Sequence, residues 1–231
     1  MLADLLLLLA ALVLVFVAAE AFTNAVEHLG ERIGVSEGVA GSIFAAVGTA
    51  MPETIVPIVA ILFGGADPHL NAEIGVGAIL GAPFMLGTIA FGVLAIAAGT
   101  ARGWRAPLRP EGSGLRRDLG FFLALFTLSV ITGLIEAAHA WKAVVAIALI
   151  FGYFFYLLLT VRASKALVEE GHGVEAENPL YFGRVLGERG WVIGLQLVVA
   201  LAVLILGARL FVRGVEGLSA WLGISALVVS L

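Results

Sequence analysis

Long uncharged stretches recur along the chain, and their lengths predict its secondary structure. A bilayer core takes about 20 residues of α-helix, and six stretches approach or exceed that length when one carboxylate, Glu53, is allowed in one of them. They are Leu5 to Ala19, Gly38 to Gly65, Ile74 to Ala101, Leu119 to Ile135, Ala143 to Val161 and Gly190 to Ala208. The pattern predicts six complete transmembrane helices and, near the end of the chain, the start of a seventh.

The composition favours a membrane protein and excludes other classes. Of the 231 residues, 61% are hydrophobic and 13% are charged, which is about half the charged fraction of a soluble domain. The net charge is −4 and the basic residues are scattered through predicted loops, so we expect no nucleic-acid partner. We predict an all-α, polytopic membrane protein whose surroundings are the lipid bilayer.

Chemistry that depends on thiols, histidine clusters or nucleotides is also disfavoured. The chain has no cysteine, and its four histidines fall in predicted loops or at helix ends. It contains no HExxH motif, no nucleophile at usable spacing from a base and no nucleotide fingerprint. We predict no enzymatic activity, no catalytic residue and no cofactor, and an intramembrane enzyme is the weakest alternative.

The distribution of Lys and Arg predicts the orientation of the chain, because cytoplasmic connections carry the excess of these residues. Ten of them fall on the side that includes the 162–189 loop, and three fall on the side of the N-terminus. No Lys or Arg precedes the first apolar stretch, which we interpret as a retained helix and not as a signal peptide. We expect a multi-pass protein of the cell membrane with its N-terminus outside and the 162–189 loop in the cytoplasm.

A weak internal repeat appears when the chain is aligned with itself at an offset of 189 residues. The matching pairs are Phe22 and Phe211, Val26 and Val215, Glu27 and Glu216, Leu29 and Leu218, Gly34 and Gly223, and Ser36 and Ser225. The two copies enter the membrane from opposite sides, as inverted transporter repeats do.

This pattern predicts three segments: a first five-helix repeat at 1–161, a cytoplasmic loop at 162–189 and the truncated start of a second inverted repeat at 190–231. We expect the rest of the second repeat beyond Leu231 or from another chain. The alternative is that the matches recur by chance in a biased composition.

One carboxylate, Glu53, lies inside a predicted membrane segment, in the sequence GTAMPE. A charge in the bilayer centre costs several kcal/mol, and such residues usually face a protein interior or an aqueous cavity on an ion path. Pro52 and Pro57 lack a backbone donor, which releases two carbonyl oxygens near the carboxylate.

The residues that share a helix face with Glu53 are Ala46, Thr49 and Ala50, whose small side chains let an ion approach the backbone. The segment therefore predicts a hard-oxygen site of the kind that Na⁺ or Ca²⁺ prefers. The alternative is a kinked helix in which a protonated Glu53 is hydrogen-bonded to a neighbour.

The third apolar stretch carries its own packing and kinking signals. Gly77 and Gly81 form a GxxxG motif, which lets another helix pack closely. Pro83 cannot donate to the carbonyl of Ile79. The prolines together predict discontinuous second and third helices that meet at a site near the middle of the membrane.

These motifs resemble those of the cation/calcium exchanger superfamily, the sodium/calcium exchangers and their prokaryotic relatives. Gly48, Thr49, Pro52 and Glu53 match the family's GTSxPE motif, and Gly77 and Gly81 match the glycines of its helix-three motif. The resemblance implies the first half of an inverted-repeat transporter that exchanges Ca²⁺ for Na⁺ by alternating access. It also implies that the Glu53 carboxylate binds the metal, with backbone oxygens of Thr49 and Ala46 as further ligands.

Four positions depart from the family's pattern. Ala50, Ala78, Ala82 and Leu86 stand where the family usually has Ser or Asn, and the last three share one helical stripe. Because neutral oxygens of that kind help to hold Na⁺ in the family, the coupling ion is left open between Na⁺ and a proton carried by Glu53. The alternative function is a non-transporting homologue or assembly partner that kept the fold and lost part of its ligands.

Overall fold

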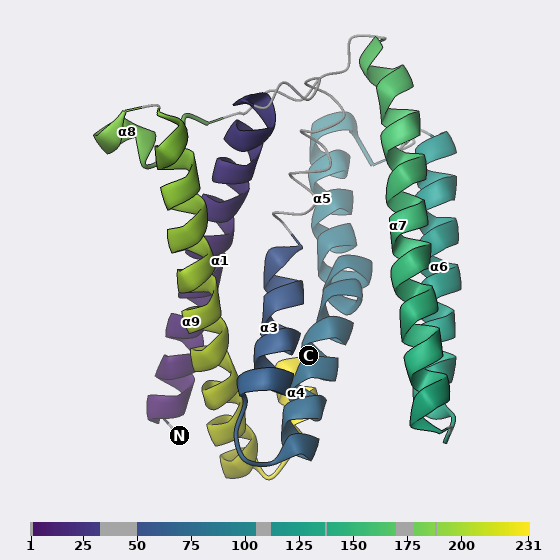
Figure 1. Cartoon of the computed structure of the whole chain (residues 1–231). Coiled ribbons are helices and arrows are strands. Elements are labelled where there is room, and N and C mark those ends of the chain that lie inside the picture. Colours follow the sequence, from purple (N-terminus) through teal and green to yellow (C-terminus); the bar gives the residue numbers. More distant parts are fainter. Residues whose placement is uncertain (1, 33–49, 105–111, 137, 170–177, 188) are drawn as a thin grey trace. The chain divides into compact units, whose positions relative to one another are not determined.

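The computed structural model describes residues 2–32, 50–104, 112–136, 138–169, 178–187 and 189–231, and every regular element in these ranges is a helix (Figure 1). The longer helices are α1 (Leu2–Arg32), α3 (Met51–Phe63), α4 (Pro68–Met85), α5 (Phe91–Arg102), α6 (Gly112–Leu134), α7 (His139–Glu169) and α9 (Gly190–Leu222). The short ones are a π-helical turn, η1 (Leu86–Ala90), and the helices α8 (Gly183–Leu186) and α10 (Ala226–Ser230).

Five of the described helices are long and apolar enough to cross a membrane, and they are α1, the helix Pro68–Arg102, α6, α7 and α9. The remaining predicted span, from Gly38 to Gly65, is represented by the apolar helix α3, since its first half lies outside the described residues. The chain is therefore an all-α, polytopic membrane protein, as the apolar stretches predict. The helices extend well past those stretches, because a helix keeps its backbone hydrogen bonds through the polar headgroup region.

The described residues form two compact units. One comprises Met1–Leu94 and Gly171–Leu231, and the other comprises Ala95–Glu170. The first unit thus joins helices from both ends of the chain. The predicted division into a first repeat at 1–161, a loop at 162–189 and the start of a second repeat at 190–231 stays a prediction.

Helices α1 and α9 pack along their length in the first unit and run antiparallel (Figure 1). Glycines on α9 allow this close approach: Gly207 lies against Val15, Gly214 against Leu8 and Gly217 against Asp4. A Cβ atom at Gly214 would lie 3.2 Å from the Leu8 Cα atom. In lipid, where burial of apolar surface does little to bring helices together, such small residues let backbones gain van der Waals contact.

The short helix α10 packs on α4 where the GxxxG motif exposes the backbone. A Cβ atom at Gly77 would lie 2.6 Å from the Leu227 carbonyl oxygen, and one at Gly81 would lie 2.6 Å from the Leu231 carbonyl oxygen. The prediction that this motif receives another helix is confirmed. Buried apolar residues of α3, α4, α9 and α10 form the adjoining core: Val56, Val59, Ala60, Ile74, Ala208, Val212, Val215 and Ala226.

The third membrane helix differs from the discontinuous form that the sequence predicts. Pro83 lies inside α4, and the helix continues through the π turn η1 directly into α5. The Leu86 amide donates to both the Ala82 and Pro83 carbonyls. A π turn widens the helix by one residue, so this helix is deformed after Pro83 and not interrupted.

A buried amide network ties the Asn178–Phe182 segment to α1 and α9. Gln196 donates through Nε2 to the Ala21 carbonyl (2.8 Å) and to Asn24 Oδ1 (3.0 Å), and its Oε1 accepts from the Phe182 amide (2.9 Å). Asn24 donates to the Asn178 carbonyl and accepts from the Tyr181 amide. Both side chains are almost fully buried, so their polar groups are satisfied inside the protein as burial requires.

The second unit contains the α6–α7 pair. The Phe121 ring packs against the rings of Phe155 and Tyr156, with centroids 6.1 and 5.4 Å away, and the Tyr156 hydroxyl donates to Asp118 (3.3 Å). Most of its described apolar side chains are exposed within the chain, as expected of helices whose surface faces lipid.

Candidate functional site

Glu53 lies on the wall of a cavity of about 260 Å³ in the first compact unit. The residues that line this cavity come from α1, α3, α4, α9 and the end of the chain: Leu12, Val15, Pro52, Glu53, Val56, Ala78, Gly81, Ala82, Met85, Phe211, Ser230 and Leu231. Glu53 is the single charged side chain of the lining, and the other members are mostly apolar. The structure thus brings this carboxylate to a cavity at the junction of helices that are far apart in the sequence.

The local sequence explains why the carboxylate lies at the beginning of a helix. Pro52 occupies the first turn of α3, where its missing N–H is not needed and its fixed φ suits the helix. Glu53 follows in the same turn, and the positive end of the helix dipole favours a carboxylate there. The Ala50 carbonyl accepts from both the Thr54 amide (3.2 Å) and the Thr54 hydroxyl (2.8 Å), which closes the first turn.

Within the part of the chain that the structure describes, Glu53 has no hydrogen-bond or ion-pair partner. Its side chain is exposed in the chain taken alone. An arginine does not neutralise it there, and no described neighbour accepts or donates a hydrogen bond to it. The carboxylate is therefore available to a cation or a proton that enters the cavity.

The two other predicted metal ligands, Thr49 and Ala46, lie outside the described residues. The predicted set of Glu53, Thr49 and Ala46 therefore stays a prediction. Among the described residues, no group of three or more His, Asp or Glu side chains is placed to hold a metal ion.

The apolar stripe on the third membrane helix divides at the π turn. Ala78 and Ala82 line the Glu53 cavity, while Leu86 begins the π turn and is not part of the lining. The α4 wall opposite Glu53 thus offers methyl groups in place of side-chain oxygens.

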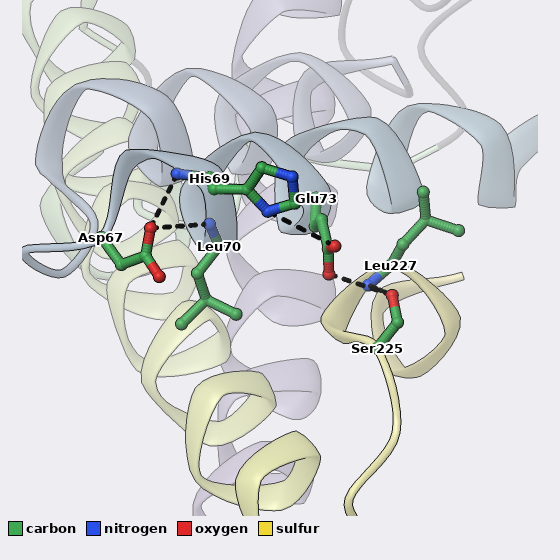
Figure 2. A network of polar contacts seen from close by, with 6 residues as sticks. All are labelled: Asp67, His69, Leu70, Glu73, Ser225 and Leu227. Carbon is green, nitrogen blue, oxygen red and sulfur yellow. Dashed lines mark hydrogen bonds and ion pairs between the residues drawn. The ribbon is translucent and has the colours of Figure 1, made fainter.

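A second polar cluster lies at the α3–α4 turn, away from the cavity lining (Figure 2). Asp67 caps α4 by accepting from the His69 amide (2.9 Å), and His69 Nδ1 lies 3.5 Å from Glu73 Oε1. Glu73 Oε2 accepts a hydrogen bond from the Ser225 hydroxyl (2.9 Å), and Ser225 in turn caps α10 by accepting from the Leu227 amide (3.1 Å). Glu73 therefore links α4 to the beginning of α10.

The links from this turn to α9 and α10 were not predicted from the sequence. Glu216 provides a second link, since its Oε1 accepts from the Gly65 amide at 3.2 Å. One signal was present: Gly223 followed two residues later by Ser225 marks the end of one helix and the start of another. Gly223 does adopt the left-handed conformation, with φ of 67°.

Comparisons with known proteins point in one direction. The sequence pattern of the family described as "Sodium/calcium exchanger protein" matches residues 4–162. The human protein "Sodium/potassium/calcium exchanger 2" is 23% identical over 152 residues, which are 66% of this chain and 21% of that protein. The rat protein of the same name is 22% identical over the same length and shares.

The chain thus spans about a fifth of the length of these two relatives. No solved structure matches the chain. The family pattern covers more than half of the sequence, including the GTAMPE and GxxxG segments. This polytopic helical membrane protein belongs to the sodium/calcium exchanger family.

Proposed function

We propose that the protein is part or all of a secondary active antiporter that exchanges Ca²⁺ for Na⁺ or H⁺ across the cell membrane. The observation that carries the proposal is the Glu53 carboxylate, which has no partner among the described residues and lies on the wall of a cavity between α1, α3, α4, α9 and α10. Membership of an exchanger family supports transport and not catalysis. The two relatives carry calcium in their names, which supports Ca²⁺ as the cargo.

Electrostatics gives the cation its role. A carboxylate in a cavity with apolar walls is costly while it is charged and unpaired. A bound Ca²⁺ or proton removes that cost, and the N-terminal end of α3 helps to hold the charged form between binding events. Glu53 would therefore alternate between cationic partners as the cavity opens to either side.

The remaining ligands follow from the family resemblance. Backbone oxygens of Thr49 and Ala46 would complete part of the Ca²⁺ shell, and a second repeat, from beyond Leu231 or from another chain, would supply the rest. Ala78 and Ala82 contribute no oxygen from the α4 wall. This favours a proton as the coupling ion, since a proton needs only the carboxylate, whereas Na⁺ needs several oxygens.

The predicted topology is also part of the proposal, with the N-terminus outside and the 162–189 loop in the cytoplasm. Segments assigned to the outer side lie together at one end of the first unit: Asp4 beside Gly217, and Gly65 bonded to Glu216. Arg32 lies beside Gly190 at the other end. The antiparallel α1–α9 pair is the arrangement that inverted repeats require, and it supports that assignment.

Transport by the reconstituted protein tests the proposal. We expect Ca²⁺ uptake into vesicles under an outward Na⁺ or H⁺ gradient, and the ion whose gradient drives uptake identifies the coupling. Glu53→Gln should abolish gradient-driven uptake, while Glu136→Gln, an exposed carboxylate between α6 and α7, should leave it intact. Uptake by Glu53→Gln at the normal rate would reject the role of this carboxylate.

A further inference from the structure

A second cavity, of about 310 Å³, lies between the end of α3 and α9. It is lined by Phe63, Gly64, Gly65, Arg209, Val212, Arg213 and Glu216, none of which lines the Glu53 cavity. Its volume is at the lower end of the range for small-molecule sites, about 300–1,000 Å³. Because two arginines and a carboxylate share this small space, the cavity is a candidate for an anionic ligand.

The two guanidinium groups are held on the same face of α9, since Arg209 and Arg213 are one helical turn apart. The Arg209 guanidinium carbon lies 5.0 Å from the centroid of the Phe63 ring. This cation–π contact does not provide a hydrogen-bond acceptor for the guanidinium N–H donors, so they remain available to a ligand.

Neither arginine forms an ion pair or hydrogen bond with another residue that the structure describes. The negative end of the α3 dipole favours a nearby cation, and the Arg209 guanidinium over Phe63 is such a cation. The third charged residue of the lining, Glu216, accepts a hydrogen bond from the Gly65 amide. Two arginines and one carboxylate give the lining a formal charge of +1. That charge matches a phosphodiester, which carries a single negative charge, better than a phosphate dianion.

The position of the cavity along α9 corresponds to the expected level of the phospholipid headgroups. The uncharged part of α9, from Gly190 to Ala208, is about 28 Å long at about 1.5 Å per residue. A bilayer core is about 30 Å thick, so Arg209 and Arg213 follow directly where the hydrocarbon ends. Arginine side chains at this depth extend toward the headgroups, whose phosphates lie at the same level.

We propose that this cavity binds the phosphate of a phospholipid headgroup through Arg209 and Arg213. The inference does not depend on transport of any ion, since it concerns a site with a separate lining. A bound headgroup would also contact both the end of α3 and α9, because the lining includes Phe63 and Gly65 as well as both arginines.

Native mass spectrometry of the purified protein, titrated with phosphatidylglycerol, tests this proposal. The double variant Arg209→Gln/Arg213→Gln should lose bound lipid by about tenfold or more, since two charge-assisted hydrogen bonds are removed. Arg189→Gln changes an exposed arginine at the opposite end of the same helix and should bind as the unmodified protein does. Equal losses in both variants would overturn the proposal.

Two further arms separate the sources of the anion. Diacylglycerol with the same acyl chains lacks the phosphate and should not be retained, so equal retention would exclude phosphate recognition. Inorganic phosphate in large excess should not displace the lipid, and displacement at equal concentration would assign the site to free phosphate. If the double variant does not fold, Arg213→Gln keeps the Arg209–Phe63 contact, and unchanged binding in this variant would equally refute the site.

Discussion

Replacing Gln196 with Leu tests whether the buried amide network holds the Asn178–Phe182 segment onto the helices. The substitution keeps the approximate size of the side chain and removes three hydrogen bonds, to the Ala21 carbonyl, Asn24 Oδ1 and the Phe182 amide. Asn24 keeps its partner at the Tyr181 amide, at 3.1 Å. The Phe182 amide loses its side-chain acceptor.

The expected loss follows from these contacts. Side-chain hydrogen bonds in membrane proteins contribute about 0.6 kcal/mol on average, and an orphaned buried amide costs about 1–3 kcal/mol. The greater hydrophobicity of Leu offsets part of this. We expect a decrease of about 2–3 kcal/mol in the free energy of unfolding, or about 5–10 °C in Tm for a chain of this size.

Thermal unfolding in detergent, followed by tryptophan fluorescence, measures the loss, and amide hydrogen exchange locates it. Exchange should increase at residues 178–182 before it increases in α9. Thr132→Val is a matched control, because it removes a hydroxyl that bonds only to the Leu128 carbonyl of its own helix. Asn24→Leu combined with Gln196→Leu should cost less than the sum of the single changes, since the pair shares a bond. A decrease below about 0.5 kcal/mol for Gln196→Leu, or unchanged exchange at 178–182, would refute the reasoning.

Three other predictions concern the packing and the links of the first unit. Gly77→Ala should destabilise the protein by about 1–3 kcal/mol in the same unfolding assay, because its Cβ atom would meet the Leu227 carbonyl oxygen at 2.6 Å. The control is Gly92→Ala, whose Cβ atom would meet nothing within 4 Å and which should be neutral or stabilising by up to about 1 kcal/mol. Equal effects of the two substitutions would contradict the close approach of α10. Ser225→Ala removes both the cap of α10 and the hydrogen bond to Glu73 and should lower the free energy of unfolding by about 1 kcal/mol. Ser219→Ala is the control. Hydrogen exchange that stays slow at the beginning of α10 in Ser225→Ala would exclude a capping role. The hydrogen bond from the Tyr181 hydroxyl to Glu20 (2.8 Å) raises the pKa of Tyr181 above its usual value of 10.0. The stability that this hydrogen bond contributes should be present below pH 10 and be lost as the pH rises through the raised pKa. A pH titration of the free energy of unfolding should therefore show this loss in the unmodified protein and not in Tyr181→Phe.

Much of the membrane character of this protein is written in local sequence. A stretch of about 20 uncharged residues is long enough to cross a bilayer wherever it lies in the chain, and backbone groups in lipid must then bond within a helix. Five such spans are found in the described residues. The placement of Glu53 in the first turn of a helix likewise depends on Pro52, its neighbour in sequence.

The packing partners depended on tertiary structure. The GxxxG motif predicted a close approach, but only the fold showed that the partner is α10, more than 140 residues further along the chain. In the sequence, Gln196 is a single polar residue in an apolar stretch. Only the fold shows that its side chain bonds to Asn24 and to the Phe182 amide. Pro83 predicted a break, whereas the helix continues past it and through a π turn.

The sequence by itself determined which segments enter the membrane and which of them carries a carboxylate. It did not determine what that carboxylate faces, because the Glu53 cavity is built from residues between Leu12 and Leu231. The physical reason is that the transfer of apolar surface into lipid depends on composition alone. Helices within lipid choose their partners by shape and by individual polar contacts, and these exist only once distant segments have come together.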